Sequence, residues 1–245
     1  MKQLFIDRGN TALKWQLVEK GSLLNEGAFT NDVPLLGGLS ILQSIELSAI
    51  SVSSVGSDSF HHDLNTWSES QRQPLPVFIE STREACGVTN VYKEPQQLGA
   101  DRWLAMLAAH NKYSGMLCVV DSGTALTMDF LQGNGKHMGG FIVPGSDLMK
   151  GCLLDNTQKI HLEKANNSGH LGKNTSEAVV FGIEQMLQIF VREKVAEIAA
   201  QYQQKISIVL TGGHAKSLLQ GLGELIYIEK DLVLQGLRLI SKSSV

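Results

Sequence analysis

Cysteine is scarce in this chain, with Cys86, Cys118 and Cys152 among 245 residues. The count is odd and no two of them have CxxC spacing, which argues against a disulfide scaffold and against a structural zinc site. Cys118 lies inside the apolar run from Met116 to Val120. We therefore expect a buried, inert thiol at this position.

Long apolar runs and an excess of one charge are also missing. No apolar run approaches the roughly 18 residues of a membrane-spanning helix, and the first one ends at Asp7, too early for the core of a signal peptide. A net charge of -3 gives no general attraction to nucleic acid or to an anionic membrane. We expect a cytoplasmic protein with neither of these partners.

What remains is the composition of an ordinary globular protein, with 43% apolar and 18% charged residues. Strand and helix patterns alternate along it. The strands are predicted at 3–6, 13–18, 48–55, 76–79, 116–120, 125–130 and 206–210, and the helices at 101–111, 177–200 and 231–240. Because strand pairs joined by short turns open each half, we expect an α/β fold with mixed sheets flanked by helices.

The two halves of the chain resemble each other weakly. Residues 5–13 read FIDRGNTAL and residues 119–126 read VVDSGTAL. Each segment has an apolar strand, an aspartate, an x-Gly step, a threonine and a return strand. This repeat indicates a duplicated domain with a cleft between the copies. With a boundary near 112–116, we expect domains at 1–114 and 115–245.

The first copy of the repeat contains the turn D-R-G-N-T at Asp7–Thr11. Gly9 allows a tight turn close to a ligand, while backbone N–H groups and the Thr11 hydroxyl can bind phosphate oxygens. Asp7 can hold Mg²⁺ together with substrate phosphates, and Lys14 can add positive charge. An ordinary hairpin turn has a similar composition. The second copy, D-S-G-T-A at Asp121–Ala125, favours the functional interpretation, because ATP held between two domains needs a loop from each.

The segment G-A-D-R at Gly99–Arg102 directly precedes a predicted helix. Asp101 can cap that helix, or it can accept the proton of an attacking hydroxyl and orient it for phosphoryl transfer. Arg102 can pair with a substrate carboxylate, or it can be a solvated surface arginine. The residues alone leave both alternatives open.

Three further segments carry weaker signals. Gly139–Gly145 reads G-G-F-I-V-P-G and can line a pocket or form a plain edge strand. Thr211–Gly213 leaves room for a flat ligand beside bare backbone, and the following His214 has no evident partner. Thr175 or Ser176 can cap the long helix, with free N–H groups facing an anion.

Taken in order, these segments resemble the type III pantothenate kinase family, within the acetate and sugar kinase, heat-shock ATPase and actin superfamily. The resemblance runs from Leu4 to about Ala215 and includes N-T at Asn174–Thr175 and T-G-G at Thr211–Gly213. Each motif alone is weak, but six in this order and spacing are specific. The resemblance implies two ribonuclease H-like domains with an ATP cleft between them.

The resemblance also implies roles for individual residues. Asp101 is the expected proton acceptor, and Asp7 and Asp121 are the expected metal ligands, Asp121 for a monovalent cation, K⁺ or NH₄⁺. The expected ATP-binding residues are Asp7, Arg8, Gly9, Asn10, Thr11, Ala12, Leu13, Lys14 and Thr124. The expected pantothenate-binding residues are Tyr92, Gly99, Ala100, Asp101, Arg102 and Thr175, the last from the partner subunit of a homodimer.

The expected activity is the Mg²⁺- and ATP-dependent phosphorylation of pantothenate to 4′-phosphopantothenate, the first committed step of coenzyme A biosynthesis. Two alternatives remain open from the residues. One is a kinase of the same superfamily that acts on another small hydroxy acid or a sugar. The other is a regulatory protein that binds nucleotide without catalysis, against which the intact Asp7, Asp101 and Asp121 argue.

Overall fold

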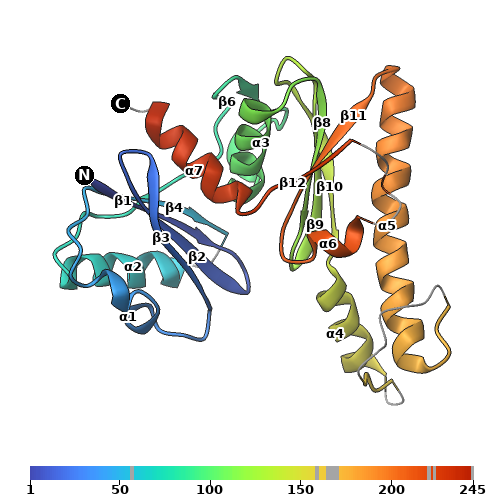
Figure 1. The fold of residues 1–245 in the computed structure, drawn as a ribbon, viewed down its shortest axis with the longest axis horizontal. Coiled ribbons are helices and arrows are strands. Elements are labelled where there is room, and N and C mark those ends of the chain that lie inside the picture. Colours follow the sequence, from blue (N-terminus) through green and yellow to red (C-terminus); the bar gives the residue numbers. More distant parts are fainter. Residues whose placement is uncertain (56–57, 158–159, 164–170, 220–221, 223–224, 244–245) are drawn as a thin grey trace. The chain divides into compact units, whose positions relative to one another are not determined.

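The structure is a computed structural model, which describes residues 1–55, 58–157, 160–163, 171–219, 222 and 225–243 (Figure 1). The chain divides into two compact units. Unit 1 comprises Met1–Lys112 and Asp231–Val245, and unit 2 comprises Tyr113–Lys230. The division after Lys112 lies close to the expected residue 114, but the C-terminal segment belongs with unit 1 and not with the second domain to which the sequence assigned it.

Unit 1 is built on a five-stranded mixed sheet. Its strand order is β3 (Ser22–Thr30), β2 (Ala12–Glu19), β1 (Lys2–Arg8), β4 (Ala49–Ser54) and β5 (Val77–Phe78). The first three strands are antiparallel, whereas β1, β4 and β5 run parallel. The parallel strands need crossover connections, and helices of the unit lie in the connections that precede β4 and β5.

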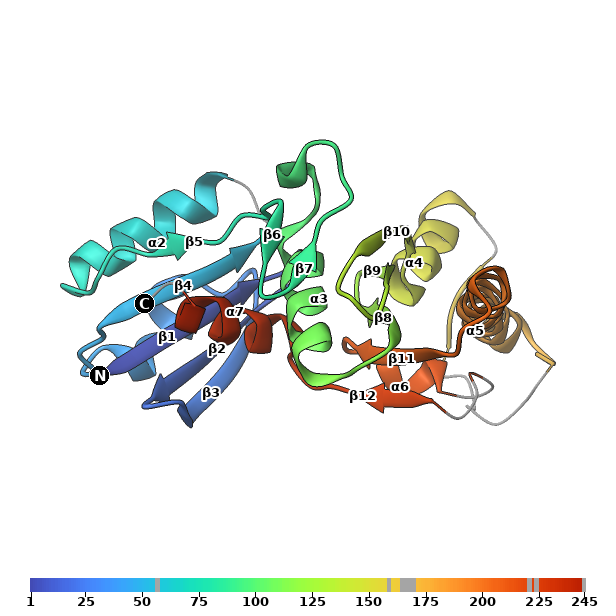
Figure 2. The ribbon, with the colours of Figure 1, turned by 90° about the horizontal axis from the view of Figure 1, so that it is seen from above.

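Helices cover both faces of this sheet, as the two views in Figures 1 and 2 show. The apolar residues Leu4 and Ile6 of β1 pack with Phe60 and Leu64 of α2 (Asp58–Ser70). Alternation along a strand places their neighbours on the other face, where α7 (Leu232–Ser243) contacts β1 and β4. The short helices α1 (Leu35–Gly38) and η1 (Ser40–Leu42) complete the side of α2.

The packing of α7 explains why the C-terminal segment joins unit 1. This helix lies against α3 (Ala100–Lys112), and Gly236 comes so close that a Cβ there would collide with the backbone of Leu104. The hydroxyl oxygens of Ser51 and Ser241 lie 3.1 Å apart. The apolar face of α7 therefore completes a core whose strands lie more than 170 residues away in sequence, a relationship that no local pattern encodes.

Unit 2 repeats the topology of unit 1. Its strand order is β10 (His137–Pro144), β9 (Ala125–Leu131), β8 (Met116–Ser122), β11 (Ile206–Thr211) and β12 (Ile226–Ile228). Again the first three strands are antiparallel and the last three parallel. The mixed sheets expected from the sequence are confirmed, and the weak internal repeat corresponds to equivalent β-hairpins, β1–β2 and β8–β9.

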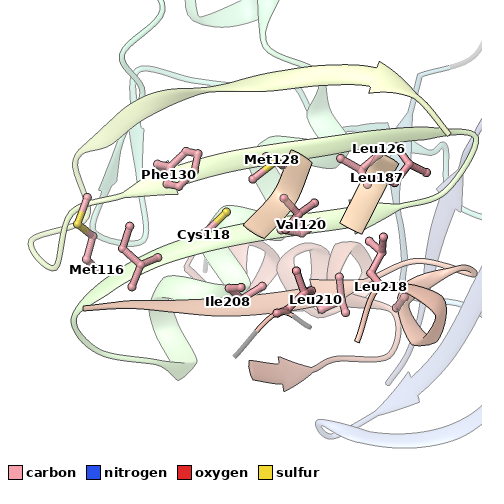
Figure 3. Close-up of a cluster of buried hydrophobic side chains, with 14 of the residues drawn as sticks. Met116, Cys118, Val120, Leu126, Met128, Phe130, Leu187, Ile208, Leu210 and Leu218 are labelled. Carbon is pink, nitrogen blue, oxygen red and sulfur yellow. The ribbon is translucent and has the colours of Figure 1, made fainter. Parts of the chain in front are cut away.

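The core of unit 2 lies between its sheet and the helix α5 (Thr175–Tyr202). Figure 3 shows Cys118 and Val120 of β8 beside Met128 of β9, Ile208 of β11 and Leu187 of α5. Cys118 is fully buried, as its sequence context predicts, and burial, followed by the nearby charge of Asp129, raises the pKa of its thiol well above the usual value. The helices α4 (Ser146–Asn156) and α6 (Ala215–Leu218) lie at the ends of strands. None of the described helices has the length and apolar character that a bilayer crossing requires.

Candidate functional site

The first candidate turn joins β1 to β2. The N–H of Gly9 donates to the carbonyl of Ala12 at 3.0 Å and closes a tight turn, in which Asn10 and Thr11 are exposed. Asp7 lies one residue before the end of β1 and pairs in register with Lys14 of β2. The strand pairing therefore places Asp7 and Lys14 opposite each other at the base of an exposed turn.

The other residues of this segment have distinct environments. The guanidinium carbon of Arg8 lies 5.2 Å from the ring centroid of Phe60, and burial lowers the pKa of Arg8. Leu13 is only 1% exposed and belongs to the core, so only its backbone is available to a ligand. Ala12 begins β2. Of the expected ATP-binding residues, Asn10, Thr11 and Thr124 are exposed.

Lys14 has a partner that the sequence did not suggest. Its ammonium nitrogen lies 2.9 Å from Oδ1 of Asp231, whose side chain is 9% exposed. Asp231 has a positive φ of 53° and immediately precedes α7. Asp231, a residue far along the chain, therefore fixes the position of the Lys14 ammonium group near the start of β2.

Asn31, which follows β3, is a second residue that the sequence analysis missed. Its side-chain amide nitrogen donates to the carbonyls of Gly9 at 3.0 Å and Asn10 at 2.8 Å. Its backbone N–H donates to the carbonyl of Thr11 at 3.1 Å. One residue thus binds three successive carbonyls of the turn. No sequence signal could have found it, because an asparagine at a strand end is common in any turn.

The second candidate cluster lies at the start of α3. Asp101 is half-buried in the first turn, and its Oδ1 accepts a hydrogen bond from the N–H of Arg102 at 2.8 Å. A Cβ on Gly99 would lie 2.5 Å from the same oxygen. Glycine at position 99 therefore leaves space that the carboxylate occupies, and the helix N-terminus favours its ionised form. The capping interpretation and the proton-acceptor interpretation are compatible in this geometry.

Arg102 is not a solvated surface residue, because only 7% of it is exposed. Its Nη1 donates to the hydroxyl oxygen of Tyr92 at 3.2 Å, and its guanidinium carbon lies 5.9 Å from the centroid of the Tyr92 ring. A buried guanidinium is stable only with polar partners. The structure thus brings together Tyr92, Gly99, Asp101 and Arg102, all of which were expected at one site.

The loop that carries Tyr92 is organised by Arg83 and Asn90. Arg83 donates to the carbonyls of Asn90 at 2.8 Å and Lys93 at 2.7 Å, on either side of Tyr92. Asn90 is 1% exposed, and its Oδ1 accepts from the N–H of Tyr92 at 3.0 Å. The loop begins with the small hairpin β6 (Glu84–Ala85) and β7 (Val88–Thr89) and ends in η2 (Pro95–Gln97). These contacts position the Tyr92 side chain against Arg102.

The third cluster surrounds Asp121 in unit 2. The turn Asp121–Thr124 joins β8 to β9, and the carbonyl of Thr124 accepts from the N–H of Gly145 at 2.9 Å. Gly212 has a φ of 95°, and a Cβ on it would collide with Oδ1 of Asp121 and with the carbonyl of Ser122. The motifs D-S-G-T, P-G and T-G-G therefore meet at one end of the unit 2 sheet.

His214, for which the sequence suggested no partner, follows this cluster. Its Nε2 lies 3.0 Å from Oδ2 of Asp147 in the first turn of α4. Burial raises the pKa of Asp147, but Lys150 and His214 together lower it below the usual value through hydrogen bonds and charge. The pair connects the loop after β11 to the helix after β10.

At Asp121 a carboxylate oxygen and the backbone carbonyl of Ser122 both lie close to Gly212. Carboxylate and carbonyl oxygens are the ligands that potassium takes in proteins, and the missing Cβ of Gly212 leaves space beside both. Within the described parts of the chain, no three His, Cys, Asp or Glu side chains gather as a metal-binding group. Mg²⁺ commonly binds through one or two carboxylates and substrate phosphates, and Asp7, at the base of the exposed turn between β1 and β2, offers one carboxylate of this kind.

Thr175 lies in unit 2, at the first position of α5. The helix cap is Asn174, whose Oδ1 accepts from the N–H of Glu177 at 2.9 Å, so neither Thr175 nor Ser176 caps it. The exposed Thr175 lines a cavity of about 690 Å³ together with Lys173 and apolar residues of α4 and α5. Its hydroxyl is thus available to a ligand.

Proteins of one family are similar to this chain over nearly its whole length. A family model described as type III pantothenate kinase matches residues 3–197. A type III pantothenate kinase of Nitrosococcus oceani is 31% identical over 98% of this chain and 94% of the relative. One of Hahella chejuensis is 35% identical, with 99% and 98% covered.

Solved structures resemble the chain in fold. A conserved Baf family protein of Campylobacter jejuni has a TM-score of 0.63 at 19% identity and covers 98% of both chains. The acetate kinase of Porphyromonas gingivalis has a TM-score of 0.53 at 12% identity over the full length of both chains. At these identities the likeness concerns the fold, and it agrees with the pair of ribonuclease H-like domains implied by the sequence.

Proposed function

The chain belongs to the type III pantothenate kinase family, and we infer that it transfers the γ-phosphoryl group of ATP to the primary hydroxyl of pantothenate. The structural observation that best supports this inference is the cluster at the start of α3. There a carboxylate at a helix N-terminus, Asp101, lies beside a buried guanidinium, Arg102, and a tyrosine, Tyr92. Pantothenate has one carboxylate and one primary hydroxyl, which matches these two charged groups.

Arg102 and Tyr92 bind the acceptor in this proposal. A guanidinium recognises a carboxylate with paired hydrogen bonds, and the Tyr92 hydroxyl orients the guanidinium by accepting from its Nη1. Gly99 and Ala100 leave the backbone accessible next to Asp101. Thr175 adds a hydroxyl contact to pantothenate, and as a homodimer the protein would supply it from the partner subunit.

Asp101 accepts the proton of the attacking hydroxyl. In phosphoryl transfer the transition state is loose and little proton transfer has occurred, so the carboxylate mainly orients the hydroxyl oxygen toward the γ-phosphorus. The hydrogen bond from the Arg102 N–H holds Oδ1 of Asp101. We assign the carboxylate of Asp101, held at this position, to the hydroxyl of the acceptor.

The ATP phosphates are bound by backbone and side-chain groups of the segment Asp7–Lys14, with a further contact from Thr124. Mg²⁺ held by Asp7 and a monovalent cation held by Asp121 would neutralise charge on the phosphate oxygens. Lys14 contributes an ammonium group whose position is set by Asp231. The exposed Asn10 and Thr11 provide the amide and hydroxyl contacts.

The direct test is to incubate the purified protein with ATP, Mg²⁺ and pantothenate in potassium or in sodium buffer and to detect 4′-phosphopantothenate by mass spectrometry. Product that forms faster in potassium supports both the reaction and the cation site. Folded protein that binds ATP but forms no product in either buffer contradicts the proposed reaction. A panel of other hydroxy acids and sugars then identifies a different acceptor.

A further inference from the structure

The turn Gly9–Thr11, which the proposed function assigns to the ATP phosphates, is held in place by Asn31, the residue that follows β3. Asn31 donates three hydrogen bonds to the turn, two from its side chain to the carbonyls of Gly9 and Asn10 and one from its backbone to the carbonyl of Thr11. Antiparallel pairing of β2 with β3 brings Asn31 there, since Ala12 pairs with Thr30 in register.

The hydrogen bonds from Asn31 to these carbonyls determine where the N–H groups of the turn point. In a planar trans peptide, the C=O and the N–H of one peptide unit point in opposite directions. The carbonyls of Gly9 and Asn10 face the Asn31 amide, so the N–H groups of Asn10 and Thr11 point away from it. Successive N–H groups that point the same way form an anion-binding concavity, and here they do so on two exposed residues.

We propose that Asn31 is a positioning residue that orients the backbone N–H groups of Asn10 and Thr11 toward the phosphates of ATP. The proposal rests on the proposed function only in taking ATP as the ligand. Asn31 itself does not contact the nucleotide, because its amide nitrogen is engaged with the two carbonyls behind the turn.

The chemistry of the side chain supports this role. The Asn31 Oδ1 is buried and has no hydrogen-bond partner among the described residues. Leaving an acceptor unsatisfied is unfavourable, and the amide keeps this orientation because its nitrogen binds two carbonyls. Aspartate has nearly the same size but would place acceptor oxygens against acceptor carbonyls, so Asn31→Asp removes the donors and preserves the volume.

The first experiment measures binding of a non-hydrolysable ATP analogue with Mg²⁺ to the full chain by calorimetry. For Asn31→Ala and Asn31→Asp we expect roughly 10-fold weaker binding, the size expected when two neutral hydrogen bonds are lost. Asn25→Ala is the matched control, since Asn25 lies on β3, the strand that Asn31 follows, and in the described contacts its side chain accepts only from the neighbouring N–H of Glu26. Steady-state kinetics should show the same rise in the KM for ATP with an unchanged KM for pantothenate.

Equal nucleotide affinity in wild type and both Asn31 variants would overturn the proposal, and so would a proportional loss of affinity for both substrates. If the variants do not fold, amide hydrogen exchange of the wild type tests the proposal instead. The bound analogue should slow the exchange of the Asn10 and Thr11 amides. No added protection at either amide also overturns it. These binding measurements do not require pantothenate, so they test Asn31 independently of the proposed reaction. If the wild-type protein binds the analogue but does not phosphorylate pantothenate, the proposed reaction is refuted. The test of Asn31 remains valid in that case.

Discussion

Arg102 and Tyr92 are joined by a hydrogen bond of 3.2 Å, although Arg102 lies in the first turn of α3 and Tyr92 in an irregular loop ten residues earlier. The guanidinium is almost completely buried, whereas the carboxylate of the adjacent Asp101 is half-buried. A buried cation strongly favours an anionic partner in a setting of low dielectric. This relationship connects the local G-A-D-R motif to the more distant Tyr92 in the proposed substrate site.

Asp101→Asn should lower turnover by about 10²–10⁴-fold, the range for loss of a general base. The amide oxygen can still accept the hydrogen bond from the Arg102 N–H, so we expect normal folding and normal binding of pantothenate. Steady-state kinetics and calorimetry with pantothenate test these expectations together. Turnover close to that of the wild type would remove Asp101 from the role of proton acceptor.

Gly99→Ala should impair catalysis through the position of Asp101. The new Cβ would lie 2.5 Å from Oδ1 of Asp101 and would displace the carboxylate, and a misplacement of about 1 Å can cost roughly 10²-fold in rate. Gly37→Ala is the control, because a Cβ there meets nothing within 4 Å. Single-turnover rates measure the effect. Equal rates for Gly99→Ala and wild type would show that the carboxylate position is unimportant.

Arg83→Gln should weaken pantothenate binding without changing nucleotide binding. The variant loses the two hydrogen bonds that hold the carbonyls of Asn90 and Lys93, and because Arg83 is exposed we expect only a roughly 5-fold increase in the KM for pantothenate. Arg192→Gln, which removes an exposed arginine from α5, serves as the control. An equal increase in the KM for ATP would indicate a general structural defect.

Gly212→Ala should abolish activation by potassium. Its Cβ would collide with the Asp121 carboxylate and the carbonyl of Ser122, and the positive φ of 95° adds backbone strain. The neighbouring Gly213→Ala is a close control, since a Cβ there meets nothing within 4 Å. The ratio of rates in potassium and in sodium separates a cation effect from a loss of stability. A ratio like that of the wild type would place the cation elsewhere.

Tyr113 should ionise at a higher pH than an unperturbed tyrosine. Burial, followed by the hydrogen bond and negative charge of Glu229, raises its pKa to about 12. Because the folded-state pKa lies above the usual value of 10.0, the stability contributed by the neutral phenol is fully present below pH 10 and is lost as the pH rises through about 12.

Ultraviolet titration of tyrosine ionisation measures this shift. Of the four tyrosines in the chain, we expect the late component to disappear in Tyr113→Phe and to remain in Tyr202→Phe. A wild-type titration without a late component, or a late component that persists in Tyr113→Phe, would contradict the structure at this position.

Much of the fold could be predicted because its signals are local. The strands β1, β2, β8, β9 and β11 and the helices α3, α5 and α7 lie within a few residues of their predicted bounds. The helix α2 was missed because it is mostly polar, although its few large apolar residues, Phe60, Leu64 and Trp67, recur at helical spacing and are buried. The strand β3 was missed because most of its residues are exposed. The short pieces β6, β7 and β12 have too few residues for any period to emerge.

The sequence by itself determined the turns and motifs, because a tight turn after a buried strand depends on a few adjacent residues such as Asp7 and Gly9. Only the tertiary structure decided which distant residues support them. Asn31 reaches its turn through the register of β2 with β3, Gly212 reaches Asp121 through the parallel pairing of β8 with β11, and Asp231 reaches Lys14 because α7 returns to unit 1. Sheet register and helix packing arise from contacts between residues far apart in the chain, and these contacts leave no pattern in any local stretch of sequence.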